Sequence, residues 1–219
     1  MTQGMKSESV AAAMLLMVAL AGCGESNVVV AQNGPPARPL QTGQTNCYDT
    51  NGNTIACAGT GQDGAFRAGV ARRYVDNGDG TITDMSTGLM WEKKSADFTI
   101  HDHGNAYMWA DAFGAFIGEL NAGAGFAGHT DWRIPNVNEL LTLVNYQNRN
   151  PAVDLAFNTS CAENCTVLTC SCTQVDFYWS STTYQSASTG AWIVSFFDGG
   201  GTQTYKGESF FVRAVRGGL

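Results

Sequence analysis

The chain has 219 residues, of which 44% are apolar and 11% aromatic, so it can bury a hydrophobic core and is not an intrinsically disordered protein. Its formal net charge of −7 argues against a general nucleic-acid binder, which needs clustered Lys and Arg. The 26 glycines follow no Gly-X-Y period, which excludes collagen. The seven cysteines are an odd number and require an explanation.

The N-terminal segment is typical of an export signal. An apolar run over residues 10–21 follows a polar start with Lys6. As a helix it would span roughly 18 Å, which is short of the roughly 30 Å hydrocarbon core of a bilayer. It therefore predicts the apolar region of a signal peptide rather than a membrane span.

The signal ends in Leu20-Ala21-Gly22-Cys23, which resembles the lipobox of bacterial lipoproteins. The resemblance implies cleavage after residue 22 and acylation of Cys23, so that the lipid bilayer becomes a partner of the chain. Because Gly24 and not Asp follows, it also implies an outer-membrane location. An ordinary secretory signal with a chance cysteine is the alternative. Residues 23–45 then form a lipidated N-terminus and flexible tether.

Residues 46–70 predict a small disulfide-linked hairpin. Cys47 and Cys57 bracket Asn51-Gly52, a strong hairpin-turn signal that would place the flanking strands side by side. Export exposes thiols to an oxidising compartment, so we expect a cross-hairpin disulfide. Removing Cys23 from the count leaves six cysteines that can pair.

The other four cysteines lie within one short segment, at Cys161, Cys165, Cys170 and Cys172. A bridge between Cys170 and Cys172 would be strained, which leaves two pairings open. One joins Cys161 to Cys170 and Cys165 to Cys172, and the other joins Cys161 to Cys172 and Cys165 to Cys170. A zinc site of four thiolates is the less favoured alternative, because paired C-x2-C spacings are missing.

The body of the chain, residues 71–219, predicts an α+β domain with two helices against a small antiparallel sheet. Residues 72–75 and 81–84 predict strands around an Asp- and Gly-rich turn, which we interpret as a turn rather than a calcium site, and 88–92 predicts a third strand. Apolar spacing predicts one helix over 107–120, and a second starts at Asn136 with Glu139 completing a capping box. Aromatic and β-branched residues predict strands over 177–182, 191–196, 202–206 and 210–216.

Three motifs in this order resemble the Lcl C-terminal domain family, named for the Legionella collagen-like adhesin. They are Asp-Asn-Gly-Asp-Gly-Thr-Ile-Thr-Asp-Met-Ser-Thr-Gly-Leu-Met-Trp over 76–91, Asp-Trp-Arg-Ile-Pro-Asn over 131–136 with Glu139, and a final set at 178–182, 191–192 and 212–216. The resemblance covers roughly residues 42–217. It implies a compact fold similar to C-type-lectin-like and formylglycine-generating-enzyme-like domains.

The namesake adhesin binds sulfated glycosaminoglycans, and this chain departs from it in two respects. It has no collagen-like repeat, and it is acidic, whereas sulfate recognition needs clustered Arg and Lys. Only Arg72-Arg73 and Lys93-Lys94 are adjacent basic pairs. The resemblance carries no agreed set of functional residues, and the four-cysteine segment is an addition to the shared pattern.

No catalytic, nucleotide-binding or metalloprotease motif is present, so the sequence predicts neither an enzyme nor a cofactor. His101 and His103 are weak metal candidates, with His129 and Asp131 as further donors, and a polar loop is the favoured interpretation. Asp131 and Arg133 flank Trp132 and indicate either a ligand site or a structural ion pair. The candidate ligand contacts are Trp132, Asp131, Arg133, Trp179, Tyr184 and Trp192.

Together these patterns predict a lipoprotein that presents a noncatalytic, adhesin-like binding domain. Its expected ligand is a glycan, bound by Trp and Tyr ring faces and by polar side chains. The alternative is a structural or assembly module that binds another envelope protein. A metal-dependent enzyme is the third hypothesis.

Overall fold

The computed structural model describes residues 38–217 of the chain. The predicted signal peptide, the lipidation site Cys23 and residues 23–37 of the predicted tether lie outside the described residues. Within the described part, no helix is both long and apolar enough to cross a membrane.

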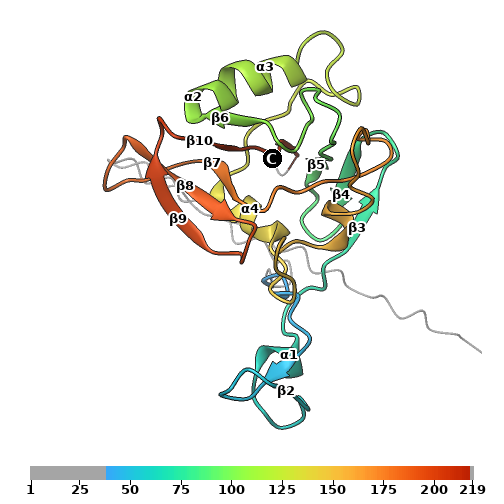
Figure 1. Cartoon of the computed structure of the whole chain (residues 1–219), viewed down its shortest axis with the longest axis vertical. Coiled ribbons are helices and arrows are strands. Elements are labelled where there is room, and N and C mark those ends of the chain that lie inside the picture. The colour runs from blue at the N-terminus through green and yellow to red at the C-terminus, as the bar shows by residue number, and fades with distance from the viewer. Residues whose placement is uncertain (1–37, 218–219) are drawn as a thin grey trace, which may run out of the picture. The chain divides into compact units, whose positions relative to one another are not determined.

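A five-stranded sheet forms the centre of the domain (Figure 1). Its strand order is β6 (Ala106–Met108), β10 (Ser209–Phe211), β7 (Phe177–Thr183), β8 (Gly190–Ser195) and β9 (Gly201–Tyr205). The pairing of β10 with β7 is parallel, and the other pairings are antiparallel. The prediction of a purely antiparallel sheet is therefore wrong for this sheet.

A second sheet is formed by strands from both ends of the domain. Its order is β11 (Val215–Arg216), β5 (Met90–Glu92), β4 (Thr81–Asp84) and β3 (Tyr74–Asp76), all antiparallel. The predicted strand over 210–216 is thus two strands, β10 and β11, which belong to different sheets. The β3–β4 turn has no need of an ion to close it, because Asp76 and Asp79 accept hydrogen bonds from Gly78 and Thr81.

The first predicted helix begins at Trp109, because Tyr107 belongs to β6. It runs through α2 (Trp109–Asp111), a π-helical turn (Ala112–Phe116) and α3 (Ile117–Leu120). The second helix, α4 (Val137–Leu143), has the predicted capping box between Asn136 and Glu139. A short 3-10 helix follows at Leu155–Phe157.

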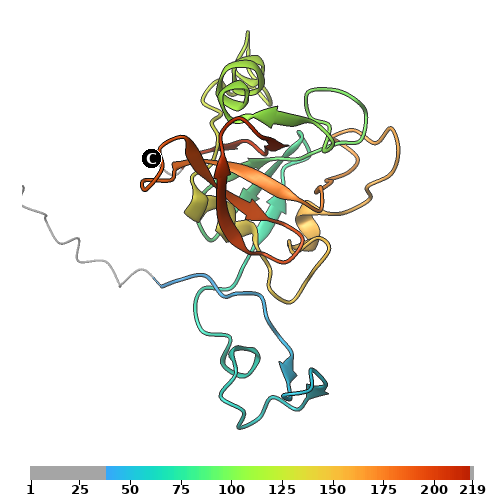
Figure 2. The ribbon, with the colours of Figure 1, turned by 60° about the vertical axis from the view of Figure 1, so that its left-hand side comes forward.

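Two apolar clusters fill the spaces around the five-stranded sheet. Alternate side chains of β7 enter different clusters: Tyr178 packs with Leu140 and Leu143 of α4, whereas Trp179 packs with Phe116 and Leu120. The helices α2 and α3 therefore cover one face of the sheet and α4 the other (Figures 1 and 2). The fold is mostly β-sheet with a few short helices.

The lead-in before the domain contains the predicted hairpin. Its strands are β1 (Cys47–Tyr48) and β2 (Thr54–Ile55), joined by the Cys47–Cys57 disulfide and followed by α1 (Asp63–Phe66). Residues 40–45 were predicted as tether, yet they contact the domain: the carbonyl of Thr42 accepts a hydrogen bond from Tyr146, and Gln147 accepts one from Thr45. The segment that can act as a tether is therefore shorter than 23–45.

Candidate functional site

Two of the predicted ligand contacts lie in the core. Trp132 is 2% exposed and Trp179 is fully buried. Each indole N–H donates to a backbone carbonyl, that of Phe126 for Trp132 and that of Tyr107 for Trp179. Neither ring has a free face for a ligand. We therefore remove Trp132 and Trp179 from the candidate set and assign them to packing.

Asp131 and Arg133 form two separate ion pairs. Asp131 accepts from Arg216 at 2.7 Å, and Arg133 donates to both carboxylate oxygens of Glu139 at 2.6 and 2.7 Å. The hydrogen bond from Arg216 lowers the pKa of Asp131. Because both charges are satisfied within the chain, the geometry favours the structural-ion-pair interpretation over a ligand site between them.

Tyr184 and Trp192 come together as a pair. Their ring centroids are 5.7 Å apart at an interplanar angle of 83°, and both side chains are partly exposed. Trp192 is opposite Gln203 on β9, and Tyr205, two residues on, projects from the same face with 61% exposure. These residues remain candidate ligand contacts.

The two histidines face different partners. The Nδ1 of His101 lies 2.8 Å from the Glu92 carboxylate, whereas the Nδ1 of His103 is buried with no hydrogen-bond partner among the described residues. Burial lowers the pKa of His103, so its ring is neutral at pH 7. Within residues 38–217, one potential metal-ligand group joins His103 to Cys161 and Cys172, and a second consists of Cys165, Cys170 and Cys172. Neither group includes His101 or His129.

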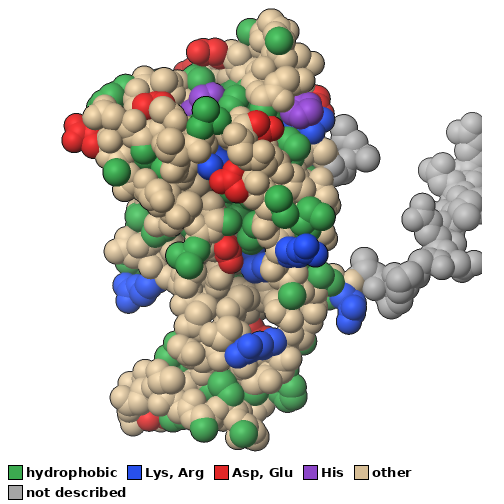
Figure 3. Space-filling view, turned by 90° about the vertical axis from the view of Figure 1, so that its right-hand side faces the viewer, with side chains coloured by type: hydrophobic (Ala, Val, Ile, Leu, Met, Phe, Trp, Pro, Cys, Tyr) green, Lys and Arg blue, Asp and Glu red, His purple; other side chains and the backbone are tan. Residues whose placement is uncertain are grey.

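The adjacent basic pairs do not form a sulfate site. Lys93 and Lys94 are 2% and 1% exposed, and Arg72 donates to the backbone carbonyls of Gln41 and Thr142. Figure 3 shows a face on which Lys and Arg side chains are interspersed with acidic ones instead of forming one basic patch. The structure therefore gives no support to a sulfated ligand bound by Arg72-Arg73 or Lys93-Lys94.

A buried charged group connects the two sheets. Lys94 lies 3.2 Å from Glu92, and Arg213 donates to the Glu92 carbonyl. Burial alone would raise the pKa of Glu92, but the Lys94 charge and the His101 contact bring it below its usual range. Burial lowers the pKa of Lys94, an effect that Glu92 opposes. The group is enclosed and structural, and no sequence pattern predicts that Lys93 and Lys94 are buried.

The loop over residues 95–105 presents one aromatic side chain to solvent. Phe98 is 84% exposed and has a backbone φ of 60°, a left-handed conformation that bulky residues rarely adopt. Its N–H donates to the buried carboxylate of Asp102 at 2.7 Å. Asp97 accepts from Ser95 and Thr99, so the loop is held by its own side chains. The loop therefore fixes the backbone of Phe98 in place.

The four-cysteine segment braces this loop. Its pairing is the second of the two predicted, with disulfides Cys161–Cys172 and Cys165–Cys170. Ala96 donates its N–H to the carbonyl of Cys165 and accepts one from Asn164. The disulfides thus hold the backbone against which the base of the 95–105 loop rests.

An open depression of about 380 Å³ lies beside Phe98. Phe98 and Ile100 supply apolar surface, and Asn105, Tyr107 and Glu119 supply polar groups. Burial raises the pKa of Tyr107, so its hydroxyl stays protonated and can donate. Among the described residues, no Lys, Arg or His lines this depression.

No motif or spacing in the sequence indicates this site. Phe98 has polar neighbours on both sides and no apolar periodicity, which in retrospect marks an aromatic residue outside the core. Its backbone conformation is set by Asp102, and no local pattern reveals that contact.

The comparison with protein families gives one match. The family described as the Lcl C-terminal domain matches residues 80–216, which is more than half of the chain. The chain therefore belongs to the Lcl C-terminal domain family, as its motifs indicated. Membership suggests an adhesin-like surface domain. No curated protein matches the chain.

Proposed function

We propose that the chain is an envelope-anchored lipoprotein whose Lcl C-terminal domain binds a neutral glycan without catalysing a reaction. The observation that carries this proposal is the fixed, exposed Phe98 beside the polar depression. Exposed aromatic surface and left-handed strain both cost free energy, so their combination at a fixed loop tip favours a role in binding.

The chemistry of the depression suits a sugar ring. A pyranose has an apolar face that can stack on the Phe98 ring and a rim of hydroxyls. Glu119 can accept from those hydroxyls, and Tyr107 can donate to the ring or glycosidic oxygens. A related lectin-like fold, as the family resemblance implies, would be consistent with such a site.

The charge of the depression favours a neutral ligand. Glu119 supplies a carboxylate to the lining of the depression, and no Lys, Arg or His among the described residues lines it. The carboxylate would therefore repel a sulfated or carboxylated sugar. This proposal departs from the sulfated ligand of the namesake adhesin.

Anchoring through acylated Cys23 completes the proposal. Acyl chains at Cys23 would hold the domain at the outer membrane, on its periplasmic face or at the cell surface. The lipobox-like Leu20-Ala21-Gly22-Cys23 supports this location. Intact-mass measurement of the membrane-extracted protein tests it by the mass of the acyl groups.

The test of binding is a glycan array that carries both neutral and sulfated sugars. We expect the full chain to bind neutral glycans, and Phe98→Ala to reduce that binding at least tenfold. Phe66→Ala is the matched control, because Phe66 is 71% exposed on α1 and does not line the depression. Binding of sulfated sugars alone, or equal binding by both variants, would refute the proposal.

The alternative is a module that binds another envelope protein. The partly exposed pair Tyr184 and Trp192, with the exposed Tyr205 beside it, favours this alternative because such aromatic surface is enriched at protein interfaces. If the chain binds no glycan on the array and one envelope protein is crosslinked to this surface, the results would favour the protein-binding alternative.

A further inference from the structure

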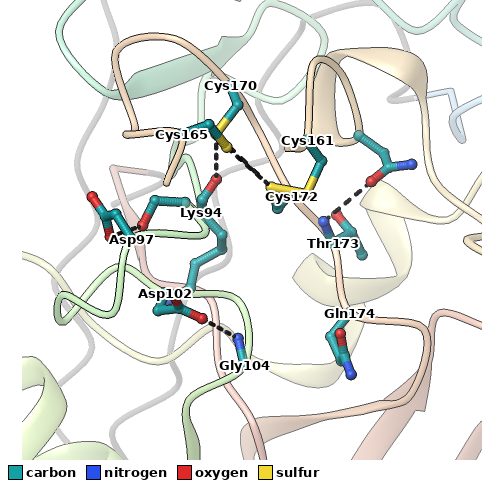
Figure 4. Close-up of a disulfide and its surroundings, with 12 residues drawn as sticks. Lys94, Asp97, Asp102, Gly104, Cys161, Cys165, Cys170, Cys172, Thr173 and Gln174 are labelled. Atoms are coloured by element: carbon teal, nitrogen blue, oxygen red, sulfur yellow. Dashed lines mark hydrogen bonds between the residues drawn. A yellow bond between two sulfur atoms is a disulfide. The ribbon is translucent and has the colours of Figure 1, made fainter. Parts of the chain in front are cut away.

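The four-cysteine segment gathers its sulfur atoms in one place (Figure 4). Besides the two bonded pairs, the sulfur of Cys172 lies 3.8 Å from the sulfurs of both Cys165 and Cys170. Four thiolates on one tetrahedral zinc ion, with Zn–S distances of about 2.3 Å, would have sulfurs about 3.8 Å apart. These two separations match those of a zinc site. Cys161 lies outside the group that Cys165, Cys170 and Cys172 form, so it would have to move to bind the same ion.

From this geometry we infer that the reduced segment is a zinc site, with Cys161, Cys165, Cys170 and Cys172 as its four ligands. The disulfide-bonded form and the metal-bound form exclude each other. The domain therefore has two alternative cross-links at the same position, the pair of disulfides or the zinc ion. This inference does not rest on the proposed glycan binding.

The sulfur positions do not depend only on the disulfides. The backbone of Cys172 donates to the carbonyl of Lys94 and accepts from Arg213, and Cys170 donates to the carbonyl of Thr166. Cys165 accepts from Ala96. The bonds of Cys172 and Cys165 join the segment to the rest of the domain, and the bond of Cys170 lies within the segment. None of them involves a sulfur atom, so we expect these three ligands to stay near one another after reduction.

Cys161 is the exposed member of the set, whereas Cys170 and Cys172 are buried at 1% and 0%. Its exposure gives a reductant access to the Cys161–Cys172 bond. A ring nitrogen of His103 lies close to the sulfurs of Cys161 and Cys172. The Nδ1 of His103 is buried and has no hydrogen-bond partner among the described residues.

The chemistry balances with a dithiol as the reductant. Each disulfide accepts two electrons and two protons from one dithiol, which leaves as its own disulfide. The four resulting thiols release four protons as four Zn–S bonds form. The product carries a net charge of −2 on the zinc and its four sulfurs.

The experiment uses the full chain. It is reduced with a trialkylphosphine under anaerobic conditions, and the phosphine is then removed. Zinc is titrated against a chelating indicator, and cobalt is used as a spectroscopic probe of sulfur ligation. We expect one zinc per chain and a sulfur-to-cobalt charge-transfer band. Cys172→Ser and Cys165→Ser should each weaken binding by more than about 100-fold.

The matched control is the double variant Cys47→Ser/Cys57→Ser, which removes the distant hairpin pair and should bind zinc as the parent does. Circular dichroism checks that each variant is folded. Two single-ligand variants are used so that the test still holds if one of them does not fold. Absence of zinc binding, or unchanged affinity in both Cys172→Ser and Cys165→Ser, would overturn the inference. If His103→Ala loses zinc binding and Cys161→Ser keeps it, the assignment of four sulfur ligands would be overturned.

Discussion

Phe98 carries two unfavourable features, a left-handed backbone and an aromatic ring exposed to water. Asn tolerates the left-handed region better than Phe and exposes no ring. We therefore predict that Phe98→Asn keeps or increases the free energy of unfolding, by up to about 1 kcal/mol, while it abolishes glycan binding. Urea unfolding and binding measured on the same variant test this.

Phe66→Asn provides the comparison for that prediction. Phe66 is similarly exposed but lies in the short helix α1, so the substitution relieves no left-handed strain. It should leave glycan binding intact and give no gain in stability. A Phe98→Asn variant that loses several kcal/mol would show that Phe98 is structural, and the proposed role would fail.

Glu92 balances the buried charge of Lys94. Because Lys94 and His101 bring the pKa of Glu92 below its usual range, the folded state takes up its proton at lower pH than the unfolded chain. This stabilisation is complete above about pH 4.3, the unfolded value, and is lost as the pH falls through the lower folded value.

Glu92→Gln leaves Lys94 buried without its counter-charge. We predict a loss of about 3–5 kcal/mol in the free energy of unfolding at pH 7 and a weaker decline in acid than the parent shows. Urea unfolding between pH 7 and pH 3 measures both effects. A variant as stable as the parent at pH 7 would contradict the account.

At the scale of elements, the α4 cap is the feature that the sequence specified most directly. The Asn136 side chain accepts from the Glu139 N–H, and the Glu139 carboxylate accepts from the Asn136 N–H. Asn136→Ala should cost about 1 kcal/mol of stability. Asn138→Ala, an exposed position on the same helix, should cost less than half as much, as thermal unfolding can determine.

Other elements depended on contacts that no local pattern records. Residues 210–216 alternate like one strand, yet Phe211 pairs with Tyr178 and Val215 with Trp91 in different sheets. The predicted helix starts at Tyr107, but Tyr107 pairs with Phe210 as part of β6. Sequence periodicity predicted the kind of most elements, failed at residues 107–108, and could not predict the sheet partners.

The same limit applies to the site. Sequence reasoning favoured the tryptophans because they are aromatic, and the fold uses Trp132 and Trp179 for its core. It paired Tyr184 and Trp192 within one candidate set, and the fold brings them into contact. It could not find Phe98, because that position depends on Asp102 and on the loop braced by distant cysteines.

For the whole molecule, the disulfides divide into two roles. Cys47–Cys57 holds the lead-in hairpin, and Cys165–Cys170 belongs to the segment that supports the 95–105 loop. Cys165→Ser/Cys170→Ser should therefore weaken glycan binding about tenfold by loosening that loop, whereas Cys47→Ser/Cys57→Ser should leave it unchanged. Calorimetric titration of both variants checks this, and equal affinities would argue against bracing.

The central claim is that the fixed loop around Phe98 forms the binding site of this Lcl C-terminal domain. Its most direct test is a map of backbone amide chemical shifts in the protein as a bound neutral glycan is titrated in. The account predicts shifts concentrated at Phe98, Asn105 and Tyr107. Shifts confined to Tyr184, Trp192 and Tyr205, with none on the loop, would contradict it.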